Sequence, residues 1–234
     1  MSSQLAGALL ELLFPGHCLL CGTSLLNAER PTEAAGCFTP VCRSCLESLR
    51  PLQGRRCRRC SAPLIVARDL CTRCRKRSYH FRDNLSLFAY SDAVKELLYQ
   101  YKFKQRRRVA PLLAYFLASA YWEHFSGLPL VPVPGRRVPD HIERICRILE
   151  RKHDIPVRRL LSRRGGVPQK SLDYARRCRN IRGTIACQRH GSSPAAEVVL
   201  LDDVFTSGAT ASECARVLVS GGIESVRVLT FALD

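Results

Sequence analysis

Four Cys-x-x-Cys pairs within the first 75 residues constrain the fold of this 234-residue chain more than any other feature. Two intervening residues let both sulfur atoms and the loop amides face one metal ion, and two such pairs complete a tetrahedral site with four thiolate ligands. Pairing in chain order predicts one zinc site from the first two pairs and a second from the last two. The predicted ligands are Cys18, Cys21, Cys42, Cys45, Cys57, Cys60, Cys71 and Cys74.

The alternatives to two structural zinc ions are a single ion and redox chemistry. Redox Cys-x-x-Cys chemistry normally uses one pair at the start of a helix, which four pairs in a basic, loop-rich region do not match. Cys37 and His17 are candidate substitute ligands, whereas Cys146 and Cys214 lie at apolar helix positions and are predicted core residues. Residues 1–80 are short of long apolar periodic segments, so this predicted cysteine-rich zinc module would draw much of its folding free energy from metal.

The pattern changes at about residue 84, where strands begin to alternate with helices. Strands are predicted at 84–90, 128–133, 197–201 and 225–233, and helices after Ser91, at 110–123, from Asp140, at 171–180 and at 209–220. This alternation predicts an α/β domain with a parallel sheet covered on both faces. Residues 81–234 are assigned to that domain.

The charge balance is strongly basic, with a formal net charge of +17 and a pI of about 9.8. Such a charge favours anionic partners, although a general arginine bias is the alternative source of most of it. No apolar run reaches the roughly 18 residues of a membrane span, and the N-terminal segment lacks the positive region of a secretory signal. The protein is therefore predicted to be cytoplasmic, where cysteines bind metal or stay free thiols.

The segment VVLLDDVFTSGAT (198–210) carries the clearest chemical signal outside the cysteines. The predicted strand ends at Asp202 and Asp203, and a turn of small and hydroxyl residues then leads into a helix. The members of the turn are Thr206, Ser207, Gly208, Ala209 and Thr210. Backbone N–H groups, hydroxyls and a helix N-terminus together form a cradle for one phosphate, because small side chains let the backbone approach closely.

The two acids cannot serve the phosphate, since they would repel it. They can accept hydrogen bonds from a vicinal diol, such as the 2′- and 3′-hydroxyls of ribose, or hold Mg²⁺ directly or through water. Sugar hydroxyls near the acids and a phosphate one turn away predict a ribose 5-phosphate ligand. An acidic helix-capping turn is the alternative, whereas a Walker-type loop is excluded because the chain has no GxxxxGK[ST] segment.

VVLLDDVFTSGAT resembles the PRPP-binding motif of type I phosphoribosyltransferases, and nearly the whole chain resembles the ComF family, also described as ComFC/GntX-like or competence-protein-F-like. That family joins a cysteine-rich zinc module to a phosphoribosyltransferase-type domain. LVPVP (130–134) resembles its pyrophosphate-side segment, and YKFKQ (101–105) its YKF segment, with Lys102 in the basic position. QKSLDYARRCRN (169–180) resembles a further family stretch, with Gln169, Leu172, Arg177 and Asn180 on the motif.

The resemblance implies a phosphoribosyltransferase-like fold that binds PRPP or ribose 5-phosphate with Mg²⁺. It also implies transfer of the phosphoribosyl group, to an acceptor that no residue identifies. Asp202 and Asp203 would stabilise the ribose ring as charge develops at the anomeric carbon, and the turn at 206–210 would hold the 5′-phosphate.

The pyrophosphate side departs from the family pattern. After the PVP segment the family usually has an Arg-Gly-aromatic run, whereas this chain has PGRRVPDHIERI. Asp140 and His141 match the end of that run. Arg136 and Arg137 could supply charge to the pyrophosphate, with solvated loop arginines as the alternative.

The second functional hypothesis is a non-catalytic protein that binds single-stranded DNA and acts with the DNA-uptake machinery, as the ComF resemblance implies for natural transformation. Such binding needs basic grooves and stacking aromatic rings. The candidates are Tyr79, His80 and Phe81 beside Arg75, Lys76 and Arg77, and Tyr99, Tyr101 and Phe103 beside Lys102, Lys104 and Arg106 to Arg108. Aromatic core positions are the alternative in both places.

Overall fold

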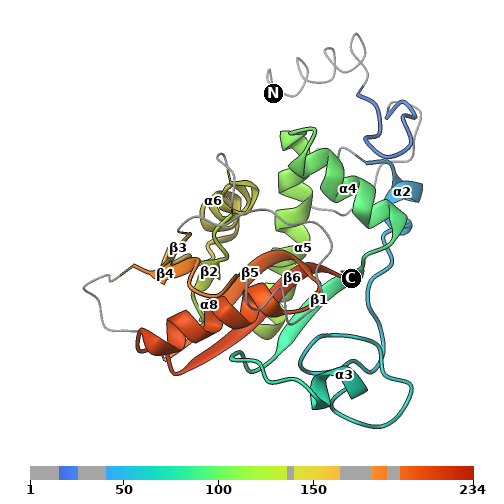
Figure 1. The fold of residues 1–234 in the computed structure, drawn as a ribbon. Coiled ribbons are helices and arrows are strands. Elements are labelled where there is room, and N and C mark those ends of the chain that lie inside the picture. The colour runs from blue at the N-terminus through green and yellow to red at the C-terminus, as the bar shows by residue number, and fades with distance from the viewer. Residues whose placement is uncertain (1–15, 26–40, 136–139, 164–180, 189–195) are drawn as a thin grey trace.

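The computed structural model describes residues 16–25, 41–135, 140–163, 181–188 and 196–234 (Figure 1). The predicted helix at 171–180, the motif residues Gln169 to Asn180, and both Arg136 and Arg137 lie outside the described residues, as does Cys37. Among the described helices, none is long and apolar enough to cross a membrane.

A four-stranded sheet forms the centre of the α/β domain, with the strand order β1-β6-β5-β2. Its strands are β1 (Asn84–Ala89), β2 (Leu130–Pro132), β5 (Glu197–Phe205) and β6 (Ser225–Leu233), and every neighbouring pair is parallel. The prediction of a parallel α/β sheet is confirmed. A separate antiparallel pair, β3 (Leu161–Arg163) with β4 (Ile185–Cys187), was not predicted, because three-residue strands carry too little alternation to be recognised.

Helices cover both faces of this sheet. The helices α4 (Asp92–Lys102), α5 (Ala110–His124) and α6 (His141–His153) lie on one face, and α8 (Ala209–Ser220) lies on the other (Figure 1). A short 3₁₀ turn, Arg107–Val109, links α4 to α5. Two caps follow directly from the sequence, since the Ser91 hydroxyl accepts the Val94 N–H and the Asp140 carboxylate accepts the Ile142 N–H at 2.9 Å. The helices predicted at these places are confirmed.

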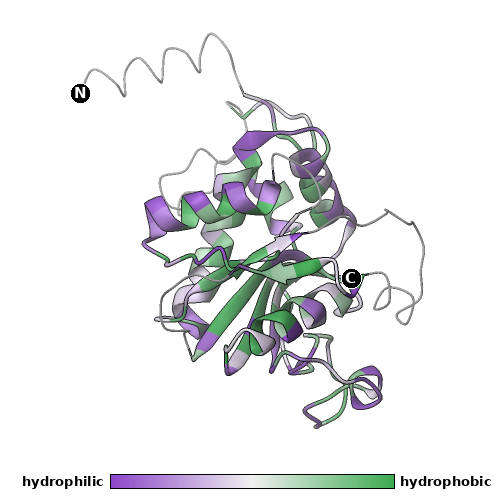
Figure 2. Cartoon of the chain, turned by 60° about the vertical axis from the view of Figure 1, so that its left-hand side comes forward, coloured by the Kyte–Doolittle hydropathy of each residue, from purple (hydrophilic) through white to green (hydrophobic). Residues whose placement is uncertain are grey.

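The central strand β5 divides its side chains between two hydrophobic clusters. Val199 and Leu201 pack with α4, α5 and α6, whereas Val198 and Leu200 pack with α8. This alternation is the period of two expected of a strand that is buried on both faces. Figure 2 shows the hydrophobic strands between helices whose outer surfaces carry the hydrophilic residues.

The predicted end of this strand at residue 201 was wrong. The strand continues to Phe205, because Asp202, Val204 and Phe205 still pair in parallel with Thr230, Ala232 and Leu233 of β6. The two acids are therefore strand residues that face opposite sides of the sheet, and only the turn after Phe205 is a loop.

Two small cysteine modules precede the sheet, and both have the same parts. In each, a hairpin closed by a single bridge (His17 with Ser24, Arg56 with Pro63) carries one cysteine pair. The other pair begins at the N-cap of a short helix, α2 (Arg43–Glu47) or α3 (Thr72–Arg75). The module at 18–45 packs on the α4 and α5 side of the sheet, and the module at 57–74 packs on the α8 side.

Candidate functional site: two zinc centres and the carboxyl end of the sheet

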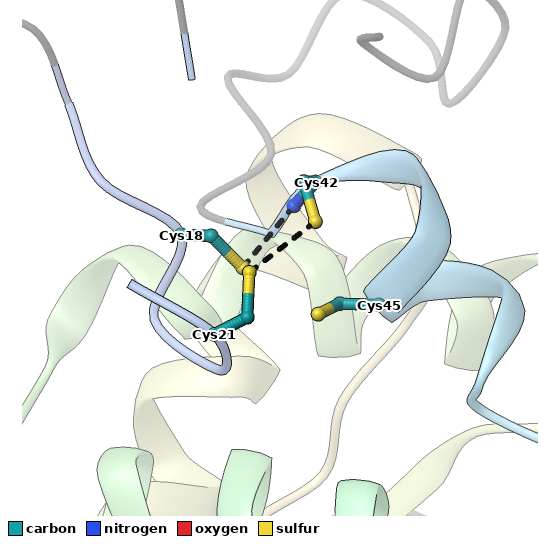
Figure 3. A group of neighbouring side chains, drawn as sticks. All are labelled: Cys18, Cys21, Cys42 and Cys45. Carbon is teal, nitrogen blue, oxygen red and sulfur yellow. Dashed lines mark hydrogen bonds between the residues drawn. The ribbon is translucent and has the colours of Figure 1, made fainter. Parts of the chain in front are cut away.

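The first zinc centre collects four thiols from the two halves of its module (Figure 3). The sulfur atoms of Cys18, Cys21, Cys42 and Cys45 all lie within 4.8 Å of one another. The Cys42 N–H donates to Cys18 Sγ at 3.4 Å, and the Sγ atoms of Cys21 and Cys42 are 3.7 Å apart. Hydrogen bonding with the Thr23 side chain and backbone is the largest cause of the lowered pKa of the Cys21 thiol, which is about 6.

The second zinc centre repeats this arrangement with Cys57, Cys60, Cys71 and Cys74, whose sulfur atoms also lie within 4.8 Å of one another. The Cys71 N–H donates to Cys57 Sγ at 3.3 Å, and the Cys74 N–H donates to Cys71 Sγ at 3.4 Å. Burial opposes ionisation of Cys71, but the Cys74 backbone and the neighbouring thiols outweigh it and lower its pKa to about 7. Cys57, Cys60 and Cys74 are buried.

Both centres fit zinc. A Zn–S bond of about 2.3 Å in a tetrahedron puts ligand sulfur atoms about 3.8 Å apart, and Cys60 Sγ and Cys71 Sγ are separated by 3.8 Å. The chain therefore has two zinc-binding sites of four cysteines each, paired in chain order as predicted. The candidate substitute His17 is not a member of either cluster; it is exposed in the first hairpin.

The two acids of the motif have different environments. Asp202 lies on the same side of β5 as Val198 and Leu200. Its negative charge helps to raise the pKa of the Cys214 thiol in α8. Its Oδ1 accepts the Asp203 N–H at 2.8 Å, and among the described residues it forms no ion pair. Burial, followed by the negative charge of Asp203, raises the pKa of Asp202 to about 7.

Asp203 faces the α4 and α6 side, where two basic residues meet it. Lys102 Nζ, at the end of α4, is 2.5 Å from Asp203 Oδ2, and His141 Nε2, at the start of α6, donates to the same oxygen. Burial opposes ionisation, but the His141 hydrogen bond and the Lys102 charge outweigh it and lower the pKa of Asp203 to about 2. The Tyr101 hydroxyl donates to the His141 carbonyl at 2.6 Å, which joins the start of α6 to α4.

The turn that follows β5 ends at the N-terminus of α8. Gly208 is the N-cap with φ of +77°, a conformation that favours glycine. A Cβ at this position would lie 2.7 Å from Phe205 and 2.8 Å from Tyr79, so the site also requires the absence of a side chain. The first amides of α8 have no partner within the helix, and their partial positive charge suits an anion.

The structure thus brings Asp202, Asp203 and the turn at 206–210 together at the carboxyl end of β5. Parallel α/β sheets bind ligands at this edge. The sequence indicates Lys102 and His141 as matches to family segments, and Lys102 also as a basic residue of the DNA-binding hypothesis, but it does not predict their pairing with Asp203. No spacing signal links residues 102, 141 and 203, because the contact arises from where α4 and α6 end against the sheet.

Comparison with known proteins gives two results for the sequence. Residues 9–75 match the family described as "Double zinc ribbon domain". The chain is 25% identical to competence protein ComFC of Bacillus subtilis, over 100% of this chain and 99% of that protein. It is 24% identical to competence protein F of Haemophilus influenzae, over 80% of this chain and 88% of that protein.

Two solved phosphoribosyltransferases overlap with part of the structure. A hypoxanthine phosphoribosyltransferase from Staphylococcus aureus is 16% identical, and the overlap covers 53% of this chain and 62% of that chain with a TM-score of 0.33. An adenine phosphoribosyltransferase from Leishmania tarentolae is 17% identical, covers 58% of this chain and 75% of that chain, and has a TM-score of 0.36. Because these scores are low, the fold class rests on the strand order and register above.

The sequence match extends over nearly the full length of competence protein ComFC. The cysteine-rich region of this chain matches a double zinc ribbon, and the structure forms both of its four-cysteine sites. The resemblance of this chain to the ComF family of competence proteins is confirmed.

Proposed function

We propose that this protein binds PRPP, or a related ribose 5-phosphate, together with Mg²⁺ at the carboxyl end of β5. The proposal rests on one observation: the half-buried Asp202 and the buried Asp203 are followed, within one strand and turn, by a glycine-capped helix N-terminus. The acids suit the sugar hydroxyls, and the turn suits the 5′-phosphate. The resemblance to ComF proteins supports the same ligand.

The donor set also fits Mg²⁺, which prefers carboxylate oxygens together with the phosphates of a substrate. Asp202 suits the metal or its water shell. Its raised pKa indicates that too little positive charge lies nearby to stabilise the ionised carboxylate, and a bound cation would supply that charge. When bound, Mg²⁺ would neutralise charge on the pyrophosphate leaving group. Asp203, held ionised by Lys102 and His141, would stabilise positive charge at the ribose ring during transfer to an acceptor. Arg136 and Arg137 remain proposed contacts of the pyrophosphate.

The test is a calorimetric titration of PRPP with Mg²⁺ into the zinc-loaded protein. The wild type should bind, and the Asp202→Asn/Asp203→Asn double variant should lose binding. Asp154→Asn is the matched control, because Asp154 is exposed at the end of α6 and has a left-handed conformation that asparagine also adopts. The absence of PRPP binding by the wild type would overturn the proposal.

A second candidate function, single-stranded DNA binding, is supported by one exposed aromatic pair. Tyr99 and Phe103 are 42% and 56% exposed, their ring centroids are 5.4 Å apart, and Lys104 Nζ lies 5.9 Å from the Tyr99 ring centroid. The basic run Arg106 to Arg108 follows directly. In contrast, Tyr79, Phe81 and Tyr101 are buried, so these three candidates are core residues rather than stacking platforms.

This second function is tested by fluorescence anisotropy with an oligo-dT strand at several salt concentrations. Affinity should fall steeply with salt, and Tyr99→Ala/Phe103→Ala should weaken binding by about 10-fold or more. Trp122→Ala, which removes another half-exposed ring, is the control. An absence of DNA binding at low salt would exclude the DNA-binding role and leave the PRPP proposal untouched.

A further inference from the structure

The segment Tyr79–Phe81 lies between the second zinc centre and the turn at 206–210. On one side, Arg59 stands between the zinc ligands Cys57 and Cys60, and its Nη1 donates to the Phe81 carbonyl at 2.7 Å and to the Tyr79 carbonyl at 3.4 Å. The zinc-binding hairpin therefore fixes the backbone of this segment. Arginine suits the task, because its planar guanidinium can reach two carbonyls at once.

On its other side, the same segment supports the turn. The Tyr79 hydroxyl donates to the Ser207 carbonyl at 3.2 Å, and the Tyr79 ring lies where a side chain on Gly208 would otherwise be. The Tyr79 and Phe81 rings are 4.9 Å apart, and Phe81 meets Phe205 edge to face at 5.9 Å. The rings of Tyr79, Phe81 and Phe205 thus pack together beneath the turn that connects β5 to α8.

A third contact reaches the first turn of α8. The His80 N–H donates to Ser212 Oγ at 3.2 Å, and the Ser212 N–H donates to the Gly208 carbonyl at 2.9 Å. The buried side chains of this region form one hydrophobic cluster with the zinc ligands Cys57, Cys60 and Cys74. The zinc ligands Cys18 and Cys42 of the first centre belong to the other cluster, on the opposite face of the sheet.

We infer that Tyr79 is a positioning residue for the phosphate-binding turn, and that the second zinc centre sets the geometry of that turn through Arg59 and Tyr79. The amides of an anion site must be held in place before the ligand arrives if they are to contribute fully to affinity. The ligand in this inference rests on the proposed function, whereas the positioning role concerns the ligand-free protein and can be tested alone.

The first measurement is hydrogen exchange of the amides at 206–212 in the ligand-free, zinc-loaded protein. Tyr79→Phe keeps the ring and removes only the hydroxyl, so exchange there should accelerate about 2- to 10-fold, because the Ser207 carbonyl loses its donor. Tyr121→Phe is the matched control, because it removes another buried tyrosine hydroxyl that donates to a carbonyl, that of Leu128, at 2.8 Å. It should leave exchange at 206–212 unchanged.

The zinc side of the inference is tested without altering a ligand cysteine. Arg59→Met should also accelerate exchange at 206–212, because the carbonyls of Tyr79 and Phe81 lose their donor. Arg58→Met, at the exposed neighbouring position, should not. Unchanged exchange at 206–212 in both Tyr79→Phe and Arg59→Met would overturn the inference.

The second measurement separates positioning from a general structural effect. Titration with ribose 5-phosphate should show weaker binding to Tyr79→Phe by about 2- to 10-fold, while the affinity for pyrophosphate should stay unchanged. An equal loss for both ligands would assign Tyr79 a merely structural role. If the wild type binds neither ligand but exchange at 206–212 still accelerates in the variants, the proposed function fails and the positioning role stands.

Discussion

The two zinc modules are built alike but are joined to the protein in different ways. Each combines a hairpin with the N-cap of a short helix, and each holds four sulfur atoms within the same distance. The first module leaves Cys21 exposed and contacts the helical layer of α4 and α5. The second buries Cys57, Cys60 and Cys74 in the core that it shares with α8.

The second module is also bound to the edge of the sheet. Ser61 Oγ donates to the Asn84 carbonyl at 2.6 Å and accepts the Ser86 N–H at 2.9 Å, and Arg56 Nη1 donates to the Ser86 carbonyl at 3.0 Å. These contacts cover part of edge strand β1, whose backbone groups would otherwise be open to pairing. The same metal chemistry can therefore stabilise a local module or form part of a larger core, depending on which residues the module buries against the rest of the protein.

The largest expected difference comes from removing one ligand of each zinc centre. Cys60→Ser should lower the free energy of unfolding by on the order of 5 kcal/mol, because metal and shared core are lost together. Cys21→Ser should cost less than half of that, because its side chain is exposed and the helical layer keeps its own core. Urea unfolding with measured zinc content checks this, and equal losses would mean that both modules are equally integral to the domain.

The next largest effect concerns the contact of the second module with the phosphate turn. Gly208→Ala should cost about 3 kcal/mol, from the left-handed backbone and from the clash with Tyr79 and Phe205. Gly127→Ala is the control, since Gly127 has a φ of +83° but no heavy atom within 4 Å of an added Cβ. It should cost about 1 kcal/mol. Similar unfolding free energies for the two variants would show that the Tyr79 contact adjusts freely.

A smaller effect is expected where the second module meets the sheet edge. Ser61→Ala should cost about 2 kcal/mol, because it leaves two buried backbone groups of β1 without their partner. Ser48→Ala in the first module removes an exposed bond to the Cys45 carbonyl at 2.6 Å and should cost less than about 0.5 kcal/mol. Thermal unfolding of the two variants side by side measures the difference in stability. A larger loss in Ser48→Ala than in Ser61→Ala would contradict the prediction.

The smallest expected effect is a difference in stability between variants of the two acids. Asp203 faces the same side of the sheet as the first module, and Asp202 faces the same side as the second. Asp202 keeps its proton up to about pH 7 in the folded protein, whereas the unfolded chain loses it near 3.8, so its contribution destabilises increasingly as the pH rises between these values. Asp203 has a lowered pKa, so its contribution is stabilising above pH 3.8 and is lost as the pH falls toward 2.

At pH 8, therefore, Asp202→Asn should raise the free energy of unfolding by about 1 kcal/mol, and Asp203→Asn should lower it by about 1 kcal/mol. Denaturant unfolding at pH 8 and pH 5 provides the measurement. The gain from Asp202→Asn should shrink at pH 5, while the loss from Asp203→Asn should persist. Shifts of the same sign would indicate that the two acids share one environment.

Much of the fold could be predicted because its signals are local. Ser91 and Asp140 are helix caps that act within three residues, and the four Cys-x-x-Cys pairs carry the zinc geometry in their spacing. The end of β5 could not be predicted, since polar residues usually end a strand and only the register with β6 keeps Asp202 to Phe205 in the sheet. The division into modules at residue 80 remains a prediction.

Sequence patterns alone predict the eight zinc ligands and their pairing, the alternation of strands and helices, and the acids and turn of the candidate ligand site. These features depend on spacing, capping and side-chain type within short segments. Only the tertiary structure placed Lys102 and His141 on Asp203, set the two acids on opposite faces, and joined the second zinc centre to the turn through Tyr79. Contacts between residues 62 to 128 positions apart depend on how whole elements pack, and no local pattern records that packing.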